Sequence, residues 1–181
     1  MRLSIAKAYE QVREFHKFLF ALIEMRDFEE FIVKETGSLA ERTEHGQAKE
    51  IFRRWNVQSE GHRNACQHMI EKVKEHTSNE WCITCMEDHL LSSYSWKRIV
   101  ADIVMPKEGS LSVTDLYAVA KNHLAIEGAA EQRYAEMSEM TDDEEMKKML
   151  MSLSKDEKIH HDEARMLMDT LEKTYGDKIR V

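Results

Sequence analysis

Two stretches in the second half of the chain, LAIEGAAEQRYAEM at 124–137 and LSKDEKIHHDEARML at 153–167, decide the fold. Their apolar residues recur every three or four positions, which is the period of a helix with one buried face. The same faces carry Glu127 and Tyr134 in the first stretch and Glu157 and His160 in the second. Carboxylates and an imidazole in such positions are typical of a metal site inside a helical bundle, because buried charge destabilises a fold unless a cation neutralises it.

The composition favours helices along the whole chain. One proline and six glycines interrupt 181 residues, while strong helix formers are abundant. This length is sufficient for one domain with a substantial core and short for two. We therefore predict a single all-α domain.

Charge and hydropathy exclude several classes of protein. The net charge is −8, and no cationic cluster is visible, so nucleic acid is not expected as a partner. The best apolar run, residues 18–23, is too short for a signal sequence or a membrane span. Three cysteines are an odd number, which disfavours a secreted disulfide framework. The sequence indicates a cytoplasmic protein that does not contact membranes.

Helix-start signals and turn residues divide the chain into five predicted helices. Capping boxes are predicted at Ser38–Glu41, Ser112–Asp115 and Thr141–Glu144, and the sequence Thr36-Gly37-Ser38 is interpreted as a break. The predicted helices cover residues 3–35, 38–76, 80–104, 112–138 and 142–174.

Short turns join the first two of these helices and the last two, so each pair predicts an antiparallel hairpin. The first hairpin covers about 3–76 and the second about 112–174. The connection at about 77–111 is long enough for a helix that runs much of the bundle's length. Two hairpins joined by a long helical crossover are the ferritin-like four-helix arrangement.

The two hairpins also resemble each other as an internal repeat. Apolar and polar residues follow the same steps of three and four in each pair of helices, which places each set on one face. The matched positions are Glu24, Phe28 and Phe31 with Glu127, Glu131 and Tyr134, and Trp55, Ser59, His62, Cys66, Met69 and Val73 with Leu153, Glu157, His160, Ala164, Leu167 and Leu171.

Glu127-x6-Tyr134 followed by Glu157-x2-His160 resembles the ferritin-like di-iron carboxylate superfamily, which includes rubrerythrins and ferritins. The resemblance implies a dinuclear iron site, with manganese or mixed metals as alternatives, that acts on O2 or peroxide with electrons from an unknown donor. It also implies a homodimer, by analogy alone. The metal ligands that it implies are Glu24, Glu127, Glu157 and His160, with His62 and Glu60 as further candidates.

The residues themselves support this chemistry. Glu157 and His160 are three apart, so both can reach one ion from a single helical turn. Carboxylates with one imidazole per metal suit iron or manganese better than zinc. For Tyr134, packing is the favoured role, and a hydrogen bond near the site or redox activity is the alternative.

The first half of the repeat departs from the family pattern. Phe31 replaces the tyrosine, and Ser59 stands where Glu157 stands in the second half. Glu60 lies about 200° around an ideal helix from His62. Either one bridging carboxylate has been lost, or a π-bulge near Gly61 turns both Glu60 and His62 inward. Of the two residues, His62 is the better candidate for the inward position.

Two other functions remain open. Cys82-x2-Cys85-x3-His89 is similar to the motif of alkylhydroperoxidase-D-like dithiol peroxidases, and a thiol at a helix N-terminus has a lowered pKa. In that interpretation Cys82 and Cys85 reduce peroxide. The third possibility is a metal-free bundle whose polar residues face a partner.

Overall fold

The structure, a computed structural model, describes residues 5–75 and 109–179. This part consists of four α-helices without strands, so the all-α prediction is confirmed for it. Residues 80–104, with Cys82, Cys85 and His89, lie outside the described residues. No described helix combines the length and the apolar character needed to cross a bilayer. The helices are α1 (Ile5–Arg42), α2 (Gly46–Glu75), α5 (Val113–Ser138) and α6 (Glu144–Ile179).

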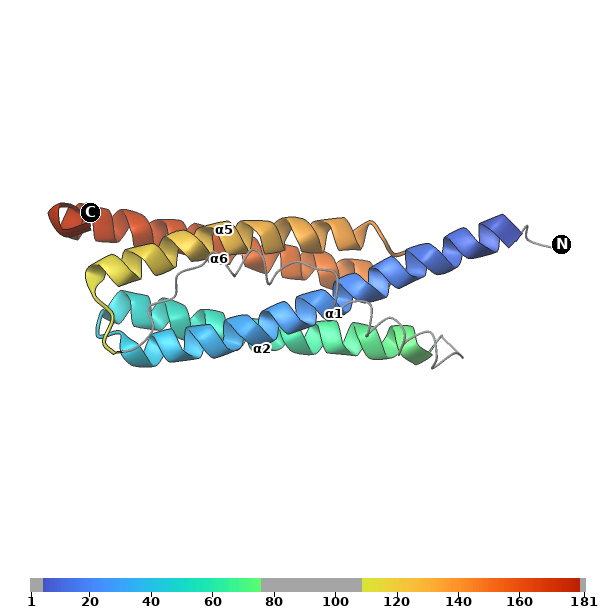
Figure 1. Cartoon of the computed structure of the whole chain (residues 1–181), viewed down its shortest axis with the longest axis horizontal. Coiled ribbons are helices and arrows are strands. Elements are labelled where there is room, and N and C mark those ends of the chain that lie inside the picture. The colour runs from blue at the N-terminus through green and yellow to red at the C-terminus, as the bar shows by residue number, and fades with distance from the viewer. Residues whose placement is uncertain (1–4, 76–108, 180–181) are drawn as a thin grey trace.

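The four helices form an elongated bundle of two hairpins (Figure 1). α1 packs against α2 and α5 against α6, and within each pair the helices run in opposite directions. Between the hairpins, α2 lies beside α6 and α1 beside α5. The end of α2 and the start of α5 lie at opposite ends of the bundle. The two hairpins are therefore joined between opposite ends of the bundle.

The break predicted at Thr36-Gly37-Ser38 is wrong, because α1 continues without interruption to Arg42. Gly37 lets α2 pack closely against α1: a β-carbon there would lie 3.2 Å from Asn56 Nδ2 of α2. That amide donates a hydrogen bond to the Val33 carbonyl of α1, which requires the close approach. The predicted cap at Ser38 is therefore helix interior, and the turn between the first two helices comes at residues 43–45.

The cap predicted for α5 is confirmed, and the one for α6 is shifted. Ser112 Oγ accepts the Asp115 N–H at 3.1 Å, and Asp115 Oδ2 accepts the Ser112 N–H at 2.9 Å. At the start of α6, the side chain of Asp143 accepts the backbone N–H groups of Glu145 and Met146. Thr141 instead accepts the N–H of Asp143. Asp143 is the better cap because its negative charge is also stabilised by the positive end of the helix dipole.

Two apolar clusters fill the bundle, one on each side of a buried polar layer. One contains the α1 residues from Phe18 to Ile32 with the end of α2 and the start of α6. The other contains Leu39 and Ala40 with the start of α2 and the end of α6. Between them lie side chains that a core normally excludes unless they are paired. These buried polar residues, which we call the polar layer, are Glu29, Ser59, His62, His123, Glu127, Glu157 and His160.

Candidate metal centre

The polar layer contains two groups of possible metal ligands that share one residue. Glu29, His62 and Glu157 form the first group, and Glu127, Glu157 and His160 form the second. In each group one nitrogen or oxygen atom per residue lies within 4.8 Å of the others, and every member is buried. The shared carboxylate of Glu157 lies between the two histidines.

The distances show how Glu157 connects the groups. Its Oε1 lies 2.8 Å from His62 Nδ1, and its Oε2 lies 3.0 Å from His160 Nδ1. Glu29 Oε1 is 3.5 Å from His62 Nδ1, and Glu127 Oε2 is 3.7 Å from His160 Nδ1. Each imidazole therefore directs its Nδ1 at two carboxylates, one shared and one of its own.

The buried carboxylates of the layer repel one another and need positive charge nearby. Burial and the negative charges of Glu29 and Glu127 raise the pKa of Glu157 well above its ordinary value. For Glu127, burial opposes ionisation, but hydrogen bonds from His123 and His160 outweigh it and lower the pKa. Three carboxylates with two imidazoles thus require cations nearby, either protons on the histidines or metal ions.

Protons on the histidines can meet this requirement in the absence of metal. Burial lowers the pKa of His62, but hydrogen bonds and charges of Glu157 and Glu29 outweigh burial and raise it to about 11. For His160, the corresponding contributions of Glu127 and Glu157 overcome burial and raise the pKa to about 10. Metal ions would bind where these protons sit, since a ligating nitrogen must be deprotonated.

The outer nitrogens of both histidines have partners of their own. His160 Nε2 donates to Gln58 Oε1 at 2.9 Å. His62 Nε2 lies 3.6 Å from Asp156 Oδ2. A metal-binding histidine usually donates its second N–H to a carbonyl or carboxylate, which fixes the ring and leaves the other nitrogen free for the ion. His160 fits this arrangement, with Nδ1 inward and Nε2 hydrogen-bonded outward. His62 has the same orientation, but its Nε2 has Asp156 within ion-pair distance only.

Two further buried side chains donate hydrogen bonds to Glu29 and Glu127, which we call the outer carboxylates. Tyr134 O–H donates to Glu29 Oε1 at 2.7 Å, and His123 Nδ1 donates to Glu127 Oε1 at 3.2 Å. His123 Nε2 is buried without a hydrogen-bond partner among the described residues. Each outer carboxylate is thus oriented by a donor on α5, and the sequence had not indicated His123 for this role.

The phenol of Tyr134 also connects the layer to a thiol. Burial and the nearby Cys66, Glu29 and Glu157 raise the pKa of Tyr134 well above its ordinary value, so it keeps its proton. Cys66 Sγ lies 3.6 Å from the phenol oxygen, and burial raises the pKa of this thiol to about 12. Because the phenol donates to Glu29, the thiol donates to the phenol. Tyr134 therefore has a hydrogen-bonding role beside the centre in addition to packing.

The structure brings together four of the ligands named from the sequence, namely His62, Glu127, Glu157 and His160, and leaves two outside. Glu24 forms an ion pair with Arg133 at 3.3 Å and belongs to neither ligand group. Glu60 is 56% exposed and lies 3.5 Å from Arg63. α2 is α-helical throughout Gly46–Glu75, so no π-bulge turns Glu60 inward.

Glu29 takes the position that the sequence analysis had assigned to Glu24. A single shift of 98 residues relates Glu29 to Glu127 and also His62 to His160. The pairing of Glu24 with Glu127 uses a different shift, 103 residues. Requiring one shift for both helices of the hairpin would have found Glu29. The same shift pairs buried Ser59 with Glu157, so one carboxylate connects the two groups where a symmetric repeat would have two.

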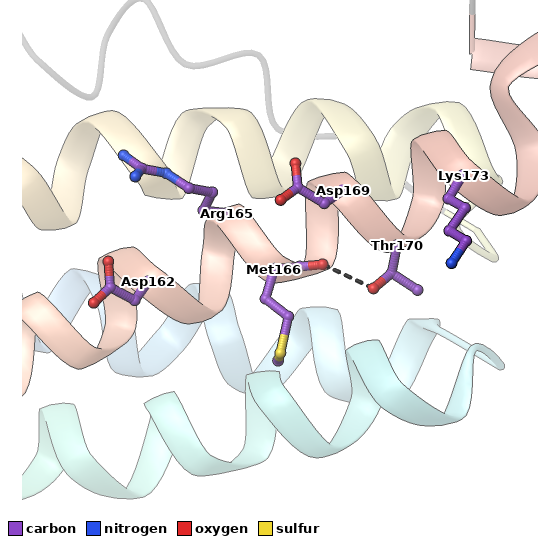
Figure 2. A pocket seen from close by; sticks show the side chains of 6 residues that line it. All are labelled: Asp162, Arg165, Met166, Asp169, Thr170 and Lys173. Carbon is purple, nitrogen blue, oxygen red and sulfur yellow. Dashed lines mark hydrogen bonds between the residues drawn. The ribbon is translucent and has the colours of Figure 1, made fainter.

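A shallow pocket on the surface of α6 lies apart from this centre. Figure 2 shows the six side chains that line it, all from α6, with Arg165 and Asp169 directed to one side and Met166 directed towards α2. None of these side chains belongs to the polar layer. The buried carboxylates and histidines are therefore the stronger candidate for chemistry.

Replacing Tyr134 with phenylalanine tests the hydrogen bond to Glu29. We expect the metal-free variant to fold and to lose about 1–3 kcal/mol of unfolding free energy, because a buried carboxylate oxygen loses its donor. Urea denaturation of chelator-treated protein measures this. Tyr117→Phe, which removes a hydrogen bond to Glu172 on the surface, is the control and should change stability by less than about 0.5 kcal/mol. Equal losses in the two variants would contradict the role of Tyr134.

Comparisons of the chain with models of protein families, with curated proteins and with solved structures found no match. Functional inference therefore depends on the chemistry of the polar layer.

Proposed function

We propose that the chain is a ferritin-like protein with a dinuclear iron centre that reduces O2 or peroxide. The observation that carries the proposal is the sharing of Glu157 by two ligand groups, each of which adds one histidine and one further glutamate. A carboxylate between two such groups is suited to bridge two ions. This donor set suits iron or manganese better than zinc, so manganese or a mixed pair is the alternative.

The path of the chain supports the ferritin-like assignment. Two antiparallel hairpins pack side by side, and the segment between them connects opposite ends of the bundle. A bundle of this kind with one long crossover connection is the ferritin-like topology, in which inward glutamates and histidines on all four helices hold two metals. In this chain α1, α2, α5 and α6 each contribute at least one member of the two groups.

Each residue of the centre has a defined role in this proposal. Glu29 and His62 would hold one ion, Glu127 and His160 would hold the other, and Glu157 would contribute to both. Iron bound there would supply the electrons that reduce the oxidant. Tyr134 and His123 orient the outer carboxylates through one oxygen each. His123 bonds Glu127 Oε1 and leaves Oε2 facing His160, whereas Tyr134 bonds Glu29 Oε1, the same oxygen that faces His62. The apolar clusters on both sides exclude water from the layer.

Metal content and peroxide consumption test the proposal together. Protein purified under iron-replete conditions should contain about two iron ions per chain, and it should consume peroxide in a reaction that chelation abolishes. Less than about half an ion per chain would contradict the proposal. Peroxide consumption that survives chelation and disappears in Cys82→Ser would instead support a dithiol peroxidase.

A further inference from the structure

The two halves of the centre have equivalent inner ligands and different outer surroundings. Each half has a histidine Nδ1, one glutamate of its own and the shared Glu157. Their outer nitrogens differ: His160 Nε2 makes a 2.9 Å hydrogen bond, and His62 Nε2 lies 3.6 Å from Asp156, which is within ion-pair distance and too long for a hydrogen bond. The difference therefore lies in what orients and covers each histidine.

The half formed by Glu127 and His160 is enclosed and held in place. The ring of Trp55 lies 6.1 Å from that of His160 and 4.7 Å from that of His123. Trp55 is itself buried, and its indole N–H donates to Glu163 at 2.8 Å. With Gln58 on one ligand and His123 on the other, both ligands are oriented before an ion arrives. Such preorganisation strengthens binding because less ordering is required when the ion binds.

The half formed by Glu29 and His62 has a partly exposed carboxylate beside its histidine. Asp156 is 39% exposed, and its Oδ2 faces the outer nitrogen of buried His62. A carboxylate that is partly in water can bind a hydrated ion, since hard divalent cations prefer oxygen ligands. Asp156 directly precedes the shared ligand Glu157 on α6, and the two carboxylates face the two nitrogens of the same imidazole, that of His62.

We propose that the two halves bind their ions unequally, and that ions reach and leave the Glu29–His62 half through the partly exposed carboxylate of Asp156. This inference rests on the proposed dinuclear centre. The enclosed Glu127–His160 half binds first and tightly. The Glu29–His62 half binds second and exchanges its ion with solution.

Titration of the metal-free full chain with Co²⁺, followed by calorimetry and visible absorption, tests the inference. Wild-type protein should bind two ions in two resolved steps. Asp156→Asn should weaken the second step about 10-fold, because the group that faces His62 Nε2 loses its negative charge, and leave the first unchanged. The control is Asp162→Asn, which removes a 58% exposed carboxylate from the same helix and should change neither step (Figure 2).

Removing one histidine at a time assigns the steps to the halves. In the His160→Ala background, the remaining site should still be weakened about 10-fold by Asp156→Asn. In the His62→Ala background, Asp156→Asn should have no effect. Circular dichroism of each metal-free variant verifies that it is folded. Gln58→Leu retains both ligating histidines and acts on the Glu127–His160 half, so it should weaken the first binding step and leave the second unchanged.

The outcomes separate this inference from the proposed function. Absence of Co²⁺ binding to the wild-type chain would overturn the dinuclear centre itself. Two ions of equal affinity would overturn only the inequality of the halves. An effect of Asp156→Asn in the His62→Ala background would overturn the assignment of Asp156 to the Glu29–His62 half.

Discussion

The Glu157→Gln variant should lose both metal ions, since the Glu157 carboxylate belongs to both ligand groups. Glutamine has nearly the same shape and lacks the negative charge, so the change removes the bridging ligand without leaving a cavity. Metal saturation at about a thousand times the dissociation constant stabilises a fold by about 4 kcal/mol. For a domain of this size, that corresponds to a shift in melting temperature of about 10 °C. The variant should show none of this metal-dependent shift.

Glu60→Gln provides the matched control for Glu157→Gln. It makes the same chemical change on the neighbouring helix at a residue that is 56% exposed. Thermal melts with and without added metal, together with metal analysis, should show wild-type behaviour for this variant. Retention of two ions by Glu157→Gln, or their loss from Glu60→Gln, would contradict the assignment of the centre.

The metal-free protein should become less stable as the pH rises above neutrality. His62 and His160 have folded-state pKa values of about 11 and about 10, both above the ordinary value of 6.5. Their stabilising contributions are therefore complete below about pH 6.5 and are lost as the pH rises through the folded-state values. One pKa unit corresponds to about 1.4 kcal/mol per group, so between pH 7 and pH 10 each histidine should lower the unfolding free energy by about 3–4 kcal/mol, and the two together by about 7 kcal/mol.

Bound metal should oppose this loss, because metal binding requires deprotonated histidines and strengthens as the pH rises. Urea denaturation at a series of pH values, with chelator or with saturating metal, measures both effects. Replacing His62 with glutamine should reduce the slope for the metal-free protein by about 1.4 kcal/mol per pH unit. His161→Gln, which changes a partly exposed histidine next to His160, should leave the slope unchanged. Equal stability of the metal-free protein at pH 7 and pH 10 would contradict the charge state of the layer.

Helical periodicity was sufficient to place most of the buried polar residues. Glu127, Glu157, His160 and His62 interrupt apolar stripes at steps of three and four, and all four are buried. The same pattern excluded Glu60 from the face of His62, and the regular α2 agrees with this. Periodicity reports which face a residue occupies, and it therefore predicts burial well where a stripe is continuous.

Periodicity was insufficient where the outcome depended on contacts between helices. Gly37 appeared to be a break because glycine disfavours helix interiors, but its missing β-carbon admits Asn56 from α2. Glu24 and Glu29 both follow apolar residues, but they have different partners on α5. Glu24 pairs with Arg133, and Glu29 accepts a hydrogen bond from Tyr134 beside the centre. Asp156 and Gln58 could not be identified because their roles depend on how α2 and α6 face each other.

The position of the polar layer between two apolar clusters also determines how the four helices align along the bundle axis. A slide of one helix by a single turn would move its charged side chain by about 5.4 Å, out of reach of its partners and into apolar surroundings. Apolar side chains tolerate such slides far better, because one hydrophobic contact can replace another. The polar layer thus fixes the axial register of the bundle: among the many alignments open to four long amphipathic helices, it favours one.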